Sequence, residues 1–235
     1  DYACGCGCVS NVRRPILSSI HSRFTKADMA QTTTTTTAPV VDAQFCAPHA
    51  TAFTVAKAPG SWFRRDLAVT DAGGAAVMRV EFPLSLSFRR RVLLLDAASR
   101  RPMVTLRRVP SRIFSATERW EAFRGSSTSP ADLLFATVEW PIRWPPSTRA
   151  TVHVHLAAGG DLGEERNTDF VVTRRGNHTR DYAVCRGSAG GVVVASLSRT
   201  IGRFGRFAYA VSVNAGVDHA FILALTMILE ESLED

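Results

Sequence analysis

The stretch that decides the fold is FAYAVSVNAGVDHAFILALTMILEESL, residues 207–233. Its first seven residues alternate between large and small side chains, with Phe207 and Tyr209 on one face, as in a β-strand. Asn214-Ala215-Gly216 is predicted to form a tight corner before a segment that is apolar on every face. A helix of that kind must be buried by protein or by lipid, so this stretch poses a choice between a core helix and a membrane anchor.

Length favours the core helix. Between Ala220 and Leu229 only Thr226 is polar, and even residues 217–233 are fewer than the roughly 20 apolar residues that a bilayer crossing needs. Asp218 suits the positive amino-terminal end of a helix. Glu230 and Glu231 crowd the other end, where the helix dipole disfavours acidic groups unless water solvates them. We therefore expect a buried helix with an exposed acidic tail.

The rest of the chain consists of short β-type runs separated by turn residues. A dozen such runs with one buried helix predict a mainly-β architecture. The runs are residues 52–55, 67–70, 75–80, 91–95, 103–107, 120–123, 134–139, 151–156, 170–174, 182–186, 192–198 and 207–213.

Consecutive runs are joined by hairpin signals. Asp71-Ala72-Gly73-Gly74, Asp96-Ala97-Ala98 and Gly187-Ser188-Ala189-Gly190-Gly191 supply the capping oxygens and the conformational freedom that tight turns require. The connectivity is thus antiparallel. A closed barrel around the terminal helix would remove the sheet edges and bury the helix at once.

The amino-terminal region, residues 1–44, is expected to be a disordered lead to a barrel domain spanning residues 45–235. It combines a Cys-Gly alternation, a Ser/Arg-rich stretch and the six threonines of Thr32–Thr37, which cannot form a core. We favour a natural translation start at Met29, with residues 1–28 being upstream sequence. An organellar transit peptide is the alternative, because the composition of residues 1–28 also fits one.

The composition is basic, with a formal net charge of +7. Only Lys26 and Lys57 are lysines, and such arginine usage fits either GC-rich coding or attraction to the phosphates of lipids or nucleic acids. Five cysteines without a regular framework indicate a reducing compartment. We expect a cytoplasmic protein. Peripheral association with the plasma membrane and an additional nuclear pool are the two alternatives for its distribution.

Catalytic and metal motifs are missing from the sequence. It contains no G-x-S-x-G, G-x-x-x-x-G-K, H-E-x-x-H or C-x-x-C motif. His153 and His155 would share the solvent face of a strand, but no third metal ligand is near them in sequence. Cys46 with His49 is equally weak, and Cys185 reads as a core thiol. We therefore predict no enzyme activity, no catalytic residues, no cofactor and no metal.

The order of several short motifs resembles the plant LURP-one-related family, whose members are similar to the Tubby carboxy-terminal domain and to the phospholipid scramblases. The resemblance implies a Tubby-like closed barrel of about twelve antiparallel strands around a buried carboxy-terminal helix. The segments are Phe53-Thr54-Val55-x-Lys57; Asp71-Ala72-x-Gly74 with Met78-Arg79-Val80; Leu94-Leu95-Asp96-Ala97 with Pro102 and Thr105-Leu106-Arg107-Arg108; Arg119-Trp120-Glu121-x-Phe123-x-Gly125; and Gly216-Val217-Asp218-x-Ala220-Phe221. The chain departs from the family pattern at residues 60–65 and 81–84 and around its prolines at 141, 145 and 146, which affects loops.

Arginine clusters are the candidate binding residues. Successive strand side chains alternate, so Arg89, Arg90 and Arg91 cannot all point outward from one strand, and part of this triplet is expected in a loop. A patch for phosphoinositide head groups, as in Tubby-like domains, is one interpretation, and scattered solvated arginines are the other. The candidates are Arg64, Arg65, Arg89, Arg90, Arg91, Arg100, Arg101, Arg107 and Arg108.

The tryptophans have a simpler interpretation. Trp120 is expected to pack across strands, whereas Trp140 and Trp144 flank proline turns. Insertion of exposed tryptophans into a membrane interface is the alternative.

The resemblance implies a non-enzymatic protein that tethers to membranes or signals, with a link to plant defence. The expected partners are anionic phospholipid head groups and unidentified proteins; nucleic acid is not favoured and no transmembrane span is predicted. A protein-interaction scaffold without lipid binding is one alternative function. Scramblase-like lipid handling is another, although the short helix lacks flanking basic anchors.

Overall fold

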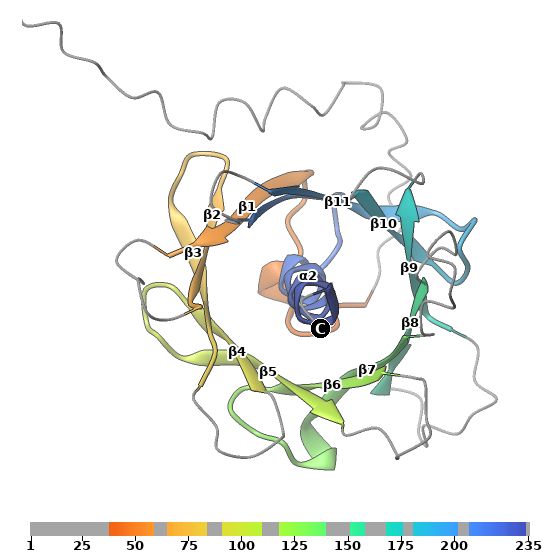
Figure 1. Cartoon of the computed structure of the whole chain (residues 1–235), viewed down its shortest axis with the longest axis horizontal. Coiled ribbons are helices and arrows are strands. Elements are labelled where there is room, and N and C mark those ends of the chain that lie inside the picture. The colour runs from red at the N-terminus through yellow and green to blue at the C-terminus, as the bar shows by residue number, and fades with distance from the viewer. Residues whose placement is uncertain are drawn as a thin grey trace, which may run out of the picture. The chain divides into compact units, whose positions relative to one another are not determined.

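The computed structural model describes residues 38–58, 65–83, 91–109, 118–139, 151–157, 168–175, 181–201 and 207–233. Every predicted strand is present in these ranges, with ends that differ from the prediction by a few residues (Figure 1). The strands are β1 (Thr51–Lys57), β2 (Leu67–Asp71), β3 (Ala76–Glu81), β4 (Arg91–Asp96), β5 (Pro102–Val109), β6 (Glu118–Arg124), β7 (Leu133–Glu139), β8 (Thr151–Leu156), β9 (Phe170–Arg175), β10 (Asp181–Arg186), β11 (Val193–Ile201) and β12 (Phe207–Val213). The helices are η2 (Ala43–Phe45), η3 (Pro130–Asp132) and α2 (His219–Leu233).

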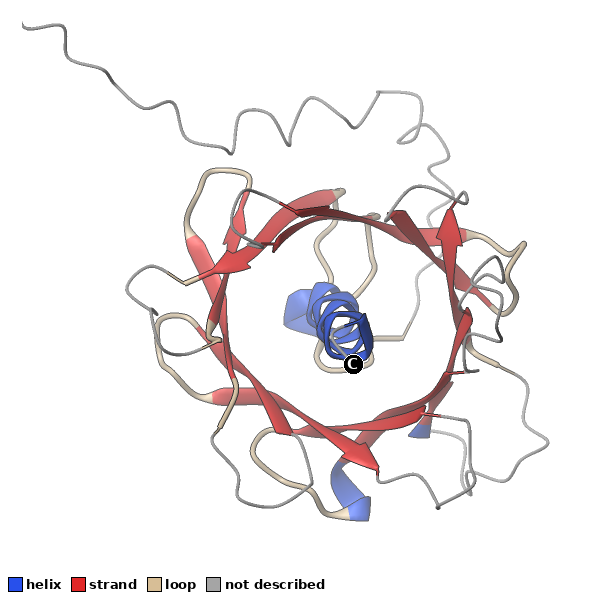
Figure 2. Ribbon diagram, viewed as in Figure 1, coloured by secondary structure: helices blue, strands red, loops and turns tan. Residues whose placement is uncertain are grey.

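The strands form a closed antiparallel barrel. Each strand pairs with the next one along the chain, and β1 closes the ring by pairing with β12, where Thr51 is opposite Val213 and Val55 is opposite Tyr209. Figure 2 shows the strands as a continuous ring with α2 at its centre. The prediction of a twelve-stranded barrel is confirmed. Closure leaves no unpaired strand edge in the sheet.

The hairpin turns follow the chemistry expected from the sequence. In the β2–β3 turn, Oδ1 of Asp71 accepts hydrogen bonds from the backbone N–H groups of Gly73 and Ala75, both at 2.9 Å. Gly74 completes this turn with a φ of 83°, a conformation that glycine adopts without a steric cost. In the β4–β5 turn the corresponding oxygen belongs to Asp96, which accepts from the N–H of Ser99 at 2.7 Å.

Helix α2 fills the lumen of the barrel. Its side chains from Ala220 to Glu231 are buried, and they pack against alternate, inward-facing residues of the strands. Phe221 illustrates the contact, because its ring lies 5.1 Å from Phe135 on β7 and 5.0 Å from Phe170 on β9. Helix α2 is therefore a core helix and not a membrane anchor. None of the helices in the described ranges combines the length and apolarity that a bilayer crossing requires.

The segment before β1 closes the lumen at the amino-terminal end of α2. Val41 is buried in the core, and the backbone N–H groups of Val41 and Asp42 donate to the Asp218 carboxylate at 2.7 and 3.2 Å. The same carboxylate caps the helix by accepting from the N–H of Phe221 at 3.1 Å. The packed part of the chain therefore includes residues ahead of the predicted boundary at residue 45. The predicted start at Met29 and the threonine tract lie outside the described residues.

Candidate functional site

The structure describes six of the nine arginines predicted from the sequence as binding candidates. Arg64, Arg89 and Arg90 lie outside the described residues. The other candidates divide between the two faces of the barrel wall and its turns; they are Arg65, Arg91, Arg100, Arg101, Arg107 and Arg108.

Arg91 and Arg107 lie side by side on the outer face. Their neighbours Val92 and Leu106 belong to the lumen core, so alternation along each strand turns Arg91 and Arg107 outward. The two arginines are directly opposite each other in the β4–β5 register. Arg107 is in turn opposite Glu121 on β6, which places all three side chains in one row across the sheet.

Arg107 is held in place by contacts on several sides. Its Nη2 donates to Oε2 of Glu121 at 2.6 Å, and its Nη1 donates to the backbone oxygen of Thr128 at 3.5 Å. The guanidinium carbon also lies 4.7 Å from the ring centroid of Phe123, a buried outer-face residue. These contacts orient the guanidinium group without removing it from the surface.

Arg119 lies beside this row, on the same strand as Glu121. It lies two residues before Glu121 on the same face of β6, and its Nη2 is 3.4 Å from Oε1 of that glutamate. The Arg119 side chain is 38% exposed, while its Nε is shielded from solvent and has no hydrogen-bond partner within the described ranges. Glu121 thus bridges Arg107 and Arg119, using one carboxylate oxygen for each.

Arg100 lies in the turn at the other end of β4 and contacts a glutamate on the outer face of β3. Its backbone adopts a φ of 59° in the β4–β5 turn, and its Nη1 reaches Oε1 of Glu81 at 3.3 Å. Glu81 pairs with Leu93, which lies two residues from Arg91 on the outer face of β4. We call Arg91, Arg100, Arg107 and Arg119, with Glu81 and Glu121, the outer arginine cluster.

The outer arginine cluster has an excess of positive charge. Four guanidinium groups face two carboxylates, and Arg91 has no ion-pair partner in the described part of the chain. Guanidinium groups bind carboxylates and phosphates through paired N–H donors in a planar fork. The arrangement can therefore bind an anionic group at the surface of the barrel.

The remaining candidates do not belong to this cluster. Arg108 turns into the lumen, where its Nε lies 2.7 Å from Oε1 of Glu118, and Trp120 donates its Nε1–H to the same oxygen at 3.0 Å. Trp120 is buried, as predicted, and Trp140 and Trp144 lie outside the described residues. Arg101 is exposed in the β4–β5 turn.

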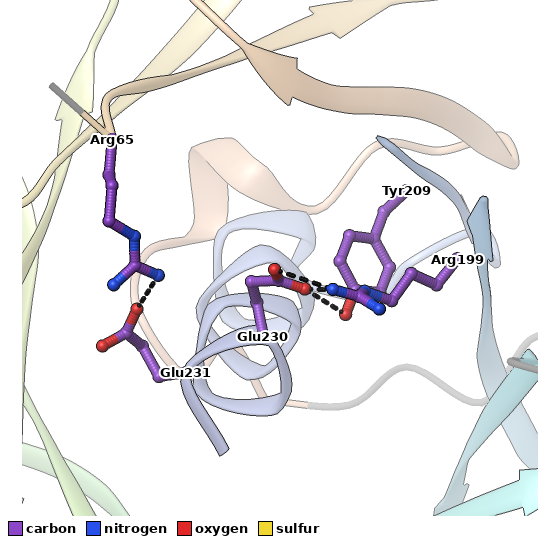
Figure 3. A network of polar contacts seen from close by, with 5 residues as sticks. All are labelled: Arg65, Arg199, Tyr209, Glu230 and Glu231. Atoms are coloured by element: carbon purple, nitrogen blue, oxygen red, sulfur yellow. Dashed lines mark hydrogen bonds and ion pairs between the residues drawn. The ribbon is translucent and has the colours of Figure 1, made fainter. Parts of the chain in front are cut away.

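Inside the barrel, the carboxyl-terminal end of α2 carries a second polar network (Figure 3). Arg199 on β11 contacts Glu230 with two donors, Nε to Oε2 at 2.8 Å and Nη2 to Oε1 at 3.0 Å. The Tyr209 hydroxyl donates to Oε2 of Glu230 at 2.8 Å. On the other side of the helix, Nη2 of Arg65 donates to Oε1 of Glu231 at 2.6 Å.

The prediction that the acidic end of the helix is exposed is wrong for its first two glutamates. Glu230 and Glu231 are both buried. The unfavourable helix dipole at this end is opposed by the charges of Arg199 and Arg65, which come from distant strands and connections. The sequence pattern could not show these partners, because they lie far from the glutamates along the chain.

Proton affinities in this network follow from the same contacts. Burial, the largest effect, lowers the pKa of Arg199, but the hydrogen bonds and charge of Glu230 outweigh it and leave the pKa raised. Burial and then the charge of Glu230 raise the pKa of Tyr209, so its hydroxyl stays protonated as a donor. The network is an ion pair with a neutral tyrosine, and it connects α2 to β11 and β12 of the barrel wall.

Sequence reasoning missed Arg119 and Glu121 as members of the candidate site. A usable signal was present, since Arg119 and Glu121 flank Trp120, which was expected to pack across the strands. If Trp120 faces inward, strand alternation turns both neighbours outward on one face. Their approach to Arg107, however, depends on the β5–β6 register.

The predicted histidine and cysteine positions do not converge on a metal site. His153 and His155 lie on the outer face of β8, and Nδ1 of His153 is 3.1 Å from the hydroxyl of Thr168. Cys185 is buried on β10, and burial raises the pKa of its thiol. Within the described ranges, no group of three or more His, Cys, Asp or Glu side chains is placed to hold a metal ion.

Comparison of the whole sequence with known proteins finds relatives of this chain. Residues 51–230 match the family model described as LURP-one-related. The chain is 30% identical over 196 residues to Protein LURP-one-related 15 of Arabidopsis thaliana, covering 82% of this chain and 84% of that protein. It is 27% identical over 197 residues to Protein LURP1 of the same plant, covering 82% and 88% respectively.

The fold also matches a solved structure. An X-ray structure of a protein from Arabidopsis thaliana superimposes with a TM-score of 0.57 at 28% sequence identity, covering 82% of this chain and 97% of that chain. The region that matches the family model includes the barrel and most of its central helix, since residues 51–230 extend from β1 into α2.

Proposed function

Because this chain belongs to the LURP-one-related family, we propose that it is a non-enzymatic module that binds anionic phospholipid head groups at a membrane surface. In this proposal the barrel is a rigid support, and the outer arginine cluster makes the contact. The protein would be peripheral at the membrane, reached from the cytoplasm. A role in plant defence stays a prediction from the family resemblance.

The first support for the proposal is that helix α2 occupies the lumen. Many barrels bind ligands inside, but here the lumen is filled by buried side chains of α2 packed on the inward-facing strand residues. The two glutamates at the carboxyl-terminal end of the helix, Glu230 and Glu231, are already paired with Arg199 and Arg65. A binding function is therefore expected on the outside of the wall.

The observation that carries the proposal is the outer arginine cluster itself. It joins three of the arginines predicted from the sequence, Arg91, Arg100 and Arg107, on one outer surface. Each basic residue close to an anionic membrane contributes about 1 kcal/mol to binding. The formal charge of +7 would attract the chain to such a surface before local contacts form.

The test measures binding of the full chain to vesicles of phosphatidylcholine alone and of phosphatidylcholine with phosphatidylinositol 4-phosphate. Binding is expected only to the second kind, and it should weaken as salt rises from about 50 to about 300 mM because the Debye length shortens. Replacing Arg91→Gln and Arg119→Gln together should weaken binding about thirtyfold, if each arginine contributes about 1 kcal/mol. Arg107 is left intact because it packs on buried Phe123.

The matched control removes two positive charges elsewhere, with Lys57→Gln on β1 and Arg175→Gln on β9, away from β4–β6 in the ring (Figure 1). It should change affinity less than about threefold, within the range of a screened surface charge. Equal losses in both double variants would show that net charge, rather than the cluster, controls binding. Equal binding to both kinds of vesicle, or binding to neither, would overturn the proposal, and the latter would favour a protein-interaction scaffold.

A further inference from the structure

The centre of the outer arginine cluster already holds an anion, the carboxylate of Glu121. One oxygen of this carboxylate lies 2.6 Å from Nη2 of Arg107, and the other lies 3.4 Å from Nη2 of Arg119. Glu121 thus spans two guanidinium groups in the way an anionic ligand would. Any ligand that uses these donors must compete with it.

We propose that Glu121 is a resident counter-ion that restricts the outer arginine cluster to phosphate monoesters. The inference rests on the proposed function, because it assumes that the same cluster is the binding surface. In the free protein Glu121 occupies Arg107 and Arg119, and a phosphate monoester displaces it. Glu121 therefore sets the affinity and specificity of the surface without contacting the ligand.

The selectivity follows from comparing the two anions that exchange. A carboxylate or a phosphodiester carries one negative charge, as Glu121 does. Its exchange with Glu121 therefore gains little electrostatic free energy, which cannot offset the entropy cost of binding. A phosphate monoester carries a charge of about −1.5 to −2 and three strong acceptor oxygens. Only the monoester brings more charge to the arginines than Glu121 already provides.

The cluster also has donors that Glu121 does not use. Arg91 is exposed and has no ion-pair partner in the described part of the chain, so its N–H groups can donate to a ligand. Arg91 is directly opposite Arg107 in the strand register, so one phosphate group seated on Arg107 lies next to it. A ligand with three acceptor oxygens matches these donors better than a two-oxygen carboxylate does.

Removing the charge of Glu121 should not disorganise the site. Arg107 keeps its position over the ring of Phe123 and its contact with the backbone oxygen of Thr128. Glutamine has the same shape as glutamate and can still accept a hydrogen bond. Glu121→Gln therefore distinguishes two roles of Glu121. If Glu121 competes with the ligand, the substitution tightens ligand binding; if Glu121 organises the arginines, the substitution weakens it.

The experiment compares vesicles that contain phosphatidylinositol 4-phosphate with vesicles that contain phosphatidylserine at the same total charge. The unaltered chain should prefer the monoester vesicles by about tenfold, and Glu121→Gln should tighten binding to phosphatidylserine by about tenfold, the equivalent of one charge-assisted hydrogen bond. Asp181→Asn removes one negative charge from β10, outside the cluster, and should leave both affinities unchanged. Thermal melting of each variant verifies its fold.

A second arm uses soluble inositol 1,4,5-trisphosphate in calorimetry. Equal affinity for the soluble compound and the monoester vesicles would identify a free phosphate ligand, with the role of Glu121 retained. If Glu121→Gln leaves phosphatidylserine binding unchanged or weaker while the unaltered chain still binds anionic vesicles, the inference fails and the proposed function stands. If no vesicle binds but Glu121→Gln tightens binding of the soluble phosphate, the proposed function fails and the inference stands.

Discussion

Glu230 is the residue on which the polar end of the lumen depends. It is fully buried, and its charge is matched by two donors of Arg199 and by the Tyr209 hydroxyl. A buried charge is costly when a partner is lost, because the remaining ion has neither water nor a counter-ion. The side chains of Phe207 and Tyr209 also lie against the Arg199 guanidinium.

Arg199→Ala should therefore lower the free energy of unfolding by about 3–5 kcal/mol, since it leaves Glu230 unpaired inside the barrel. Tyr209→Phe should cost less, about 1.5–3 kcal/mol, because it removes one hydrogen bond to a charged group. Urea denaturation measures both values. A loss below about 1 kcal/mol for Arg199→Ala would show that the pair behaves as an exposed one.

His219 makes the other end of the lumen sensitive to pH. Its ring lies 5.3 Å from Phe45 and 5.0 Å from Phe53, and its Nδ1 has no hydrogen-bond partner in the described ranges. Burial lowers the pKa of His219, although the charge of Asp218 and a hydrogen bond with the Phe45 backbone act in the opposite direction. The folded state therefore favours the neutral ring.

Because the pKa of His219 is lower in the folded state, the unfolded state binds a proton more readily. Stability is therefore highest at a pH above the unfolded pKa of about 6.5, and it falls as the pH drops below that value. The unfolding midpoint in urea should decrease between about pH 7.5 and 5.5, and His219→Gln should reduce that decrease. The pKa of His153 is also lowered, first by burial and then by His155, so His153→Gln is the comparison variant. An unchanged pH dependence in His219→Gln would contradict this assignment.

At the scale of the element, α2 is apolar on every face, and the surrounding strands bury all of these faces. Its apolar side chains contact the inward-facing residues of strands around the whole ring, so no face of the helix needs water or lipid. Asp218 fixes the start of the helix and Arg199 and Arg65 fix its end. The helix forms the centre of the core and supplies the apolar surface against which the inward-facing strand residues pack.

Leu225→Asp should accordingly prevent folding, because position 225 is buried within the apolar core cluster and the new carboxylate would lose its hydration there. Leu225→Met, which nearly conserves volume, should cost less than about 1.5 kcal/mol and serves as the control. Circular dichroism and soluble yield distinguish the two. A folded, soluble Leu225→Asp chain that had merely lost membrane binding would mean that the helix is a lipid anchor.

At the scale of the whole molecule, the segment before β1 belongs to the barrel. It contributes Val41 to the core, two backbone donors to Asp218 and a backbone acceptor, the oxygen of Val41, to Arg124. The backbone oxygen of Ala47 also accepts from the N–H of Gly216 at 2.8 Å. Residues 41–47 thus connect the first strand, the wall and the start of α2.

A chain that starts at Ala38 should melt at the same temperature as the full chain, whereas one that starts at Ala47 should melt at least about 5 °C lower. Loss of Val41 burial alone is worth about 1.5–3 kcal/mol, and each kcal/mol shifts the melting temperature of a domain of this size by about 2–4 °C. Differential scanning calorimetry gives both values. Identical melting of the two shortened chains would exclude this segment from the cooperative core.

The sequence by itself determined the elements and their arrangement. Alternation located the strands, aspartate and glycine marked the turns, and a helix too short for a bilayer but apolar on every face had to lie inside. These signals are local, because they depend on neighbouring residues and on the period of each element. The order of the short motifs also indicated the family, and the match over residues 51–230 confirms it.

Only the tertiary structure decided which polar groups meet. Arg107 and Arg108 are adjacent in sequence yet face opposite sides of the wall, while Arg91 and Arg119 join one cluster through the register of β4, β5 and β6. Arg199 and Arg65 allow the acidic end of α2 to be buried, contrary to the prediction from its sequence. Such pairings depend on strand register and on closure of the barrel, which bring together residues that no local pattern relates.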